Sequence, residues 1–214
     1  MDTKALSDTG RRAAPPTAMG DEPGENGDGM YMDTTYLNAP AMLGSGLLIA
    51  RLVLGSLMVA HGGQKLFGWL GGYGLRGTGG FFEQLGFRPG VLFAGVAAVT
   101  EVASGLLVAL GFLGPVGPAL MISVMLVAAV SVHLHNGLLA GTNGVEIPVL
   151  YATGALALAL VGPGPYSVDA ALGLASFWTP GMTVTALVLG VVGAAANLAM
   201  RRPQAARAPE ASGA

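Results

Sequence analysis

Long runs of apolar residues, separated by shorter polar or glycine-rich segments, fill the chain from residue 42 onwards. A helix needs roughly 20 mostly apolar residues to cross a bilayer. Five runs approach or reach this length, so the fold class is predicted to be all-α, a polytopic membrane protein. The alternative, the buried core of a large soluble protein, is disfavoured because the runs have no polar face to meet water. The five runs lie at about 43–67, 90–111, 115–135, 146–162 and 182–200.

The segment between the first two runs, 68–89, is rich in glycine and aromatic residues. Aromatic side chains favour the depth of the lipid headgroups. We therefore expect an interfacial segment here, with FFEQLGF (81–87) forming one or two helical turns on the membrane surface.

The two ends of the chain have a different composition from the apolar runs. Residues 1–41 carry seven acidic and three basic side chains and few large apolar ones, which is typical of a disordered tail. We expect this tail not to be a signal peptide, because no apolar run follows its basic residues. Residues 204–214 are also expected to be disordered.

Formal charge is scarce and excludes several functional classes. Only 10% of the 214 residues are charged, whereas a soluble domain usually has about 25%. No basic stripe with interleaved aromatics is present, so nucleic acid is not an expected partner, and the lipid bilayer is. The chain has no cysteine, which excludes disulfides, Cys-ligated zinc, iron–sulfur clusters within this chain and covalent c-type haem.

The distribution of lysine and arginine predicts an orientation. If the five runs alternate across the bilayer, all basic residues within about 20 residues of a span fall on one side. These residues lie at the end of the first run, in the segment after it, or after the last run. The expected arrangement has the C-terminus in the cytoplasm and the acidic N-terminus outside. The basic residues concerned are Lys65, Arg76, Arg88, Arg201, Arg202 and Arg207.

The first run carries an unusual polar stripe. Its members are spaced by three or four residues, so at about 100° per residue they share one face of a helix. His61 lies beside this stripe, four residues before Lys65. The stripe consists of Arg51, Gly55, Met58, Gly62 and Lys65.

The second run has one carboxylate, Glu101, close to its middle. About ten apolar residues on either side place it about 15 Å from each end. Because a buried carboxylate either takes up a proton or pairs with a cation, we expect Glu101 to pair with Arg51, His61 or both. The pair could be functional, or it could only fix which faces of the two helices meet.

Polar residues also occur near the ends of the third and fourth runs. His133 and His135 are two positions apart and diverge on a helix, so helix-end caps are favoured over a metal site, and no metal is assigned. Glu146, followed by Ile147 and Pro148, is typical of a helix start. In GPGPYSVDAALG (162–173), Ser167 or Asp169 can cap a short helix, DAALGLAS.

Four of these pieces together resemble the DoxX family of small integral membrane proteins. The resemblance covers about Arg51 to Gly173. It rests on Arg51 with HGGQK (61–65), TEVASGLLVALG (100–111), NGVEIPVLY (143–151) and GPGPYSVD (162–169). It implies a four-helix membrane bundle at 42–175, to which the fifth helix, 176–203, and the tail at 1–41 are additions.

The resemblance also implies a functional context. Some members of the family are small subunits of a thiosulfate:quinone oxidoreductase, and others associate with enzymes of oxidative stress. A quinone, not covalently bound, is the expected ligand, with redox proteins as partners and the bacterial plasma membrane as location. By resemblance, Glu101 and His61 would be catalytic, and quinone binding would fall to Arg51, Lys65, Glu146 and Asp169.

Three rival functions stay open at this stage. A membrane scaffold would use the buried ion pair only to hold the bundle. A haem b protein would use His61 with His133 or His135 as ligands. A small transporter is disfavoured because the five runs show no inverted repeat.

Overall fold

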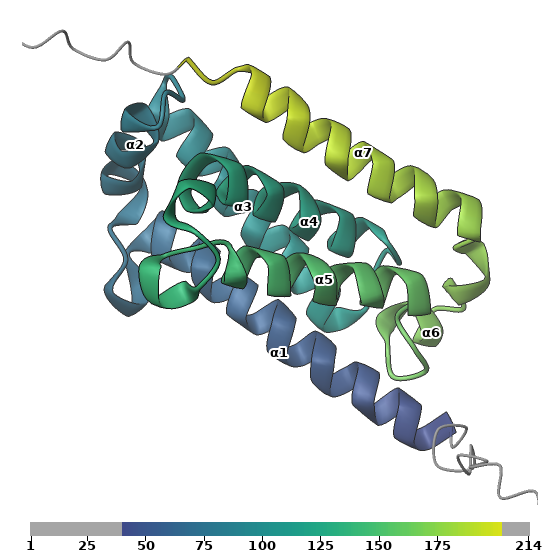
Figure 1. The fold of residues 1–214 in the computed structure, drawn as a ribbon. Helices are drawn as coiled ribbons and strands as arrows, with labels where there is room; N and C mark the ends of the chain where they lie inside the picture. Colours follow the sequence, from purple (N-terminus) through teal and green to yellow (C-terminus); the bar gives the residue numbers. More distant parts are fainter. Residues whose placement is uncertain (1–39, 203–214) are drawn as a thin grey trace, which may run out of the picture. The chain divides into compact units, whose positions relative to one another are not determined.

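A computed structural model describes residues 40–202, and within this range every regular element is helical (Figure 1). The tails predicted at 1–41 and 204–214 lie almost wholly outside the described residues. Short 3₁₀ or π-helical turns occupy Trp69–Gly71, Ala129–His133, Leu134–Asn136, Ala140–Thr142 and Ala175–Phe177. The α-helices are α1 (Pro40–Phe67), α2 (Gly74–Gln84), α3 (Gly90–Leu110), α4 (Val116–Ala128), α5 (Glu146–Val161), α6 (Val168–Ala171) and α7 (Pro180–Ala199).

The helices confirm the five predicted apolar runs. In the described part of the chain, four helical segments are long and apolar enough to cross a membrane: α1, α3, α7, and α4 with its continuation to Asn136. The fifth, α5, has 16 residues and spans about 24 Å, slightly less than the roughly 30 Å of a hydrocarbon core. The protein is an integral membrane protein, and the large apolar side chains exposed along α1, α5 and α7 face lipid.

Helices α1 and α3 approach each other closely where glycine residues face each other. A Cβ atom placed on Gly55 would lie 2.5 Å from the carbonyl oxygen of Gly105, and one on Gly105 would lie 2.6 Å from that of Gly55. Two turns further along α1, Gly62 packs against the side chain of Val102, where a Cβ would lie 2.5 Å from Cγ2. Small residues allow such close approach where no hydrophobic effect drives helices together, so these glycines fix the register of the pair.

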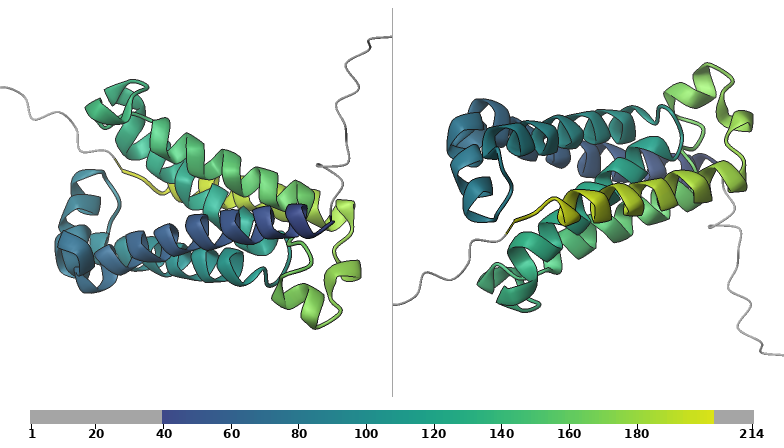
Figure 2. Two further views of the ribbon diagram at one scale, coloured as in Figure 1. Left: turned by 90° about the horizontal axis from the view of Figure 1, so that it is seen from below. Right: turned by 90° about the horizontal axis from the view of Figure 1, so that it is seen from above.

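Helix α4 lies at the centre of the other half of the bundle. It packs against α3, α5 and α7, as the views in Figure 2 show for α7. Gly190 of α7 meets the backbone of Ala119 in α4, where a Cβ would lie 2.6 Å from the carbonyl oxygen. The buried core between the halves includes Met58, Val108, Met121, Met125, Tyr151 and Leu158.

The segment 68–89 differs from its prediction as a short surface helix. Helix α2 begins at Gly74, earlier than expected, and packs along α3. Gly79 permits this packing, because a Cβ there would lie 2.9 Å from the Cα of Val91. The glycines that made this segment look irregular in the sequence allow it to lie against the bundle.

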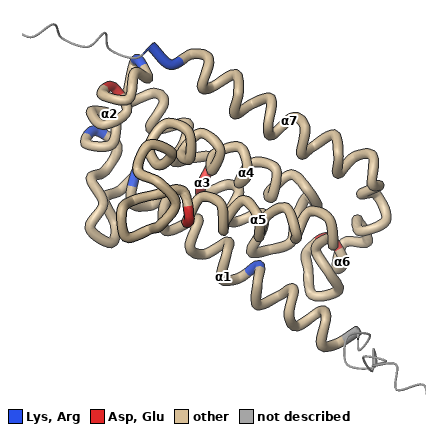
Figure 3. The backbone as a smooth tube through the Cα atoms, in the orientation of Figure 1, with Lys and Arg blue, Asp and Glu red and all other residues tan. Residues whose placement is uncertain are grey.

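Most of the basic residues that the structure describes gather at one end of the bundle, which also holds the acidic residues of α2 and of the start of α5 (Figure 3). Lys65, Arg76, Arg88, Arg201 and Arg202 belong to the end that contains α2 and the last turn of α7. This is the grouping that the alternation of spans predicts; which side of the membrane it faces stays a prediction.

Candidate functional site

An ion pair between Lys65 and Glu101 joins α1 to α3. The Nζ atom of Lys65 lies 2.8 Å from Oε1 and 2.7 Å from Oε2 of Glu101. The Glu101 side chain is 4% exposed and that of Lys65 is 26% exposed. Side chains of a helix tilt toward its N-terminus, so Lys65, in the last turn of α1, reaches back into the bundle to meet the carboxylate.

The predicted partners of Glu101 were wrong. Arg51 lies beside the C-terminal end of α3, and its guanidinium donates to the carbonyl oxygen of Tyr166. The ring of His61 faces that of Tyr151 in α5, edge to face, with centroids 5.7 Å apart. Gly55 lies against Gly105 and Gly62 against Val102, so Arg51 lies beyond the level of Glu101, near Gly111. His61 lies close to that level, but its ring faces α5.

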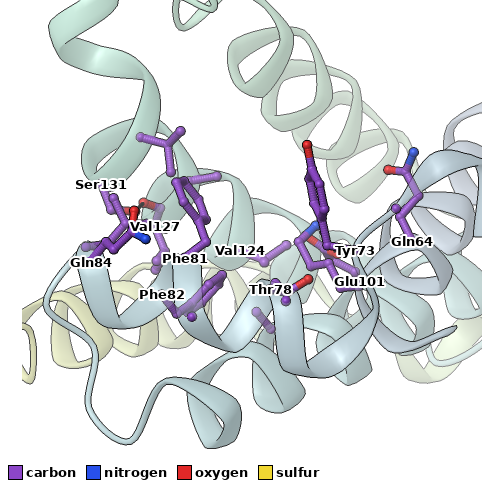
Figure 4. A pocket seen from close by; sticks show the side chains of 18 of the residues that line it. Gln64, Tyr73, Thr78, Phe81, Phe82, Gln84, Glu101, Val124, Val127 and Ser131 are labelled. Carbon is purple, nitrogen blue, oxygen red and sulfur yellow. Dashed lines mark hydrogen bonds and ion pairs between the residues drawn. The ribbon is translucent and has the colours of Figure 1, made fainter. Parts of the chain in front are cut away.

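Beside the ion pair lies an open pocket of about 680 Å³, lined by the end of α1, α2, α3, α4 and the π-helical turn. Figure 4 shows its lining spread from Ser131 and Gln84, past the rings of Phe81 and Phe82, to Glu101. Twelve of the twenty lining residues are apolar or glycine, and eight carry hydrogen-bonding side chains. These polar residues are Gln64, Lys65, Tyr73, Thr78, Gln84, Glu101, Ser131 and His133.

The π-helical turn Ala129–His133 brings two polar side chains to this cavity. Ser131 donates to the carbonyl oxygen of Val127. His133 Nδ1 lies 2.8 Å from the carbonyl oxygen of Asn143. A carbonyl only accepts, so Nδ1 carries the proton in this bond and Nε2 of a neutral ring is left as an acceptor. The predicted capping role of His133 is wrong: its ring bonds the following loop and makes no cap hydrogen bond at the end of the span.

Two other predicted site residues, Arg51 and Asp169, lie at the opposite end of the bundle. Asp169 is fully buried, and its carboxylate accepts the backbone N–H groups of Leu113 (3.0 Å) and Gly114 (2.7 Å). The Nε and Nη1 atoms of Arg51 are buried without a partner in residues 40–202. Ser167, not Asp169, caps α6, accepting the N–H of Ala170 at 3.1 Å.

Glu146 has a structural role outside the cavity, as its position predicted. It begins α5, and its Oε2 accepts the N–H of Ala140 at 2.7 Å. His135 is exposed and lines no part of the cavity. Among the residues that the structure describes, no three of the side chains His, Asp and Glu converge as metal ligands.

Residues 46–134 match the model of the DoxX family. The chain contains a DoxX domain. The matched segment runs from α1 through the π-helical turn and contains both members of the ion pair. No curated protein and no solved structure matches the chain.

Two of the four motifs that suggested DoxX, NGVEIPVLY and GPGPYSVD, lie beyond the matched segment. Of the six residues expected to form the DoxX site, the structure brings only Lys65 and Glu101 to the cavity. The sequence did not reveal the contributions of Tyr73, Phe81 and Ser131. Only the structure points to Ser131, because this residue lies in a π-helical turn and such turns are frequent at functional sites.

Proposed function

We propose that this DoxX-domain membrane protein binds a quinone in the cavity and acts as a membrane subunit or partner of a redox enzyme. The observation that carries the proposal is the pair of a partly buried Lys65 and a buried Glu101, in the wall of a cavity that combines apolar and hydrogen-bonding side chains. Ionisable residues within membrane spans are costly and commonly mark substrate or proton pathways.

The cavity suits the chemistry of a quinone. Its volume of about 680 Å³ is typical of small-molecule sites, which range over about 300–1,000 Å³ and combine apolar walls with a few polar groups. A quinone has a flat ring, two carbonyl acceptors and an apolar tail. Phe81 and Phe82 offer aromatic faces to the ring, and the hydroxyl of Tyr73 offers a donor.

Lys65 is the natural donor to a quinone carbonyl. An ammonium group has three N–H donors. Two of them satisfy the oxygens of Glu101, and the third makes only a long bond of 3.5 Å to the carbonyl oxygen of His61, which a quinone carbonyl could replace. Reduction of a quinone to a quinol takes two electrons and two protons. In this proposal a partner oxidoreductase supplies the electrons, Lys65 orients the carbonyl oxygen, and Glu101 exchanges protons with it through the ammonium group.

Photolabelling with an azidoquinone tests the proposal. The purified protein is labelled in detergent, and the modified peptides are identified by mass spectrometry. We expect label on α2 or the π-helical turn, competition by unlabelled decylubiquinone, and a several-fold loss of label in Phe81→Leu and in Lys65→Met. Equal labelling of cavity residues and of the lipid-facing surface of α7, insensitive to competitor, would contradict it.

Matched variants outside the cavity serve as controls. Phe177→Leu removes an exposed aromatic ring, and Tyr166→Phe removes a hydroxyl group as Tyr73→Phe does. Neither residue lines the cavity. Quinone labelling in these two variants should equal that of the unmodified protein, whereas Tyr73→Phe should reduce it.

A second candidate function is that of a non-catalytic membrane scaffold. It is favoured because the hydrogen-bonding capacity of the Glu101 carboxylate is already used within the protein. Both oxygens of Glu101 already contact Lys65, and the carboxylate is almost fully buried. A scaffold needs the two helix faces to meet but needs no charge. If the apolar double variant Lys65→Met/Glu101→Leu folds and keeps every redox phenotype of the cell, the scaffold is supported and the quinone site is not.

A further inference from the structure

Three arginines gather where the α2–α3 connection meets the end of α7 (Figure 3). The N–H of Arg202 donates to the carbonyl oxygen of Gly86 at 2.8 Å. Arg201 donates through Nε to the carbonyl oxygen of Leu85. Arg88 follows Gly86 by two residues. Backbone contacts therefore hold two segments that are far apart in the sequence side by side, and each segment contributes guanidinium groups.

This cluster, Arg88, Arg201 and Arg202, has no matching negative charge. Within residues 40–202 the ion pair is Lys65–Glu101, so none of the three guanidinium groups lies within 4.0 Å of a described carboxylate. The acidic residue of α2, Glu83, accepts the N–H of Gly90 at 3.2 Å. Arg88 and Arg202 are exposed, so their donors are free for an outside anion.

The cluster also lies at a definite depth. The apolar helix α7 ends at Ala199, and the arginines follow at once. Exposed aromatic side chains, Trp69 in the turn after α1 and Tyr73 directly before α2, belong to the same end of the bundle. Aromatic residues and arginines directly after an apolar span mark the level of the lipid headgroups.

We infer that Arg88, Arg201 and Arg202 form a binding site for the phosphate group of an anionic phospholipid. Guanidinium groups bind phosphate oxygens in a two-pronged geometry, and basic clusters at the ends of spans attract anionic lipids. A lipid fits better than a free anion, because the phosphate of a lipid is held at this depth by its acyl chains. This inference does not depend on the proposed quinone site.

Native mass spectrometry of the full chain tests the site. Protein purified in neutral detergent is mixed with phosphatidylglycerol or with phosphatidylcholine of the same acyl chains. We expect selective retention of phosphatidylglycerol. The double variant Arg88→Gln/Arg202→Gln should bind it roughly 30-fold more weakly, from the energy of two basic residues at an anionic surface. The backbone bond from Arg202 to Gly86 and the side-chain bond of Arg201 both remain, so the fold is retained.

Arg76→Gln is the matched control, because it removes one charge from the opposite end of α2. It should change retention less than about twofold, since the charge lies away from the bound phosphate. Equal retention of the two lipids, or equal losses in Arg88→Gln and Arg76→Gln, would overturn the inference. Displacement of phosphatidylglycerol by millimolar inorganic phosphate would identify a small-anion site and would also overturn it.

Discussion

Gly55 and Gly105 face each other across α1 and α3, and the Cβ atom that either residue lacks would lie within 2.5–2.6 Å of the other's carbonyl oxygen. Both glycines lie between the levels of the two polar groups of α1, Arg51 and Lys65. The close contact therefore fixes how far α1 slides along α3, and with it which cation of α1 reaches Glu101.

Gly105→Ala is expected to destabilise the α1–α3 pair. Overpacking a tight contact costs about 1–3 kcal/mol, because the helices must separate to admit the methyl group. Unfolding of the detergent-solubilised protein with heat, followed by circular dichroism, measures the loss. Gly46→Ala is the control, since a Cβ at this position in α1 meets nothing within 4 Å; equal stability of the two variants would contradict the argument.

The Lys65–Glu101 pair predicts strong non-additivity. Removing one partner by Glu101→Leu leaves a partly buried ammonium group unpaired. This should cost less than the about 3–5 kcal/mol of a fully buried charge, whereas replacing both partners by apolar residues is often nearly neutral. The double variant Lys65→Met/Glu101→Leu should therefore be more stable than Glu101→Leu alone. Chemical or thermal unfolding of the four proteins of the cycle measures this; additive losses would show that the pair is not coupled.

Arg51 and Gly111 should also be coupled. A Cβ on Gly111 would collide with the Arg51 guanidinium, and Gly111 adopts φ +63°, which disfavours other residues. Gly111→Ala should destabilise the protein by about 2 kcal/mol or more. In an Arg51→Met background the collision with the guanidinium is gone, whereas the backbone strain and the contact of the new Cβ with Cβ of Ser167 at 2.7 Å remain. The same change should therefore cost about 1 kcal/mol less. An unchanged cost in that background would remove the steric explanation.

The sequence predicted the helices better than the partners of their polar residues. Apolar length alone located every span, and spacing put Arg51 and Lys65 on one stripe. Which of them meets Glu101 depends on the relative shift of α1 and α3, because both residues are cations on the same face. That shift is set by the contact between Gly55 and Gly105. It cannot be predicted from the sequence of either helix alone, because it depends on how the two helices pack.

The cavity was less predictable than the ion pair for a related reason. Its outer wall is α2, and glycine-rich sequences such as Gly71–Gly80 have little hydrophobic periodicity to indicate a packed helix. Its other side includes Ser131, which a π-helical turn orients. Both features result from packing between segments, so neither the apolar pattern nor the charges of the separate runs reveals them.

Asp169 should stabilise the turn between α3 and α4. Its buried carboxylate accepts two backbone N–H groups, and Asp169→Ala leaves both donors unsatisfied. The expected loss is about 3 kcal/mol. Asp169→Asn keeps one acceptor oxygen and should lose about half as much. Ser167→Ala is the control for comparison, because it removes a cap from the neighbouring helix α6 and should lower the stability by about 1 kcal/mol. A loss in Asp169→Ala no larger than this would contradict the stabilising role of Asp169.

The arrangement of the spans predicts opposite accessibility for the two ends of the bundle. Because the chain has no cysteine, a single introduced thiol can be labelled alone. Gly141→Cys adds a side chain to the exposed loop before α5, where a Cβ meets nothing within 4 Å, and Ser176→Cys is an isosteric change in the turn before α7. Lysine and arginine concentrate at the end that contains Gly141, so the positive-inside rule places this end in the cytoplasm.

A membrane-impermeant maleimide added to intact cells should label Ser176→Cys and leave Gly141→Cys unlabelled until the cells are opened. Labelling of Gly141→Cys alone would reverse the orientation, and labelling of both from outside would contradict the odd number of spans between the two positions.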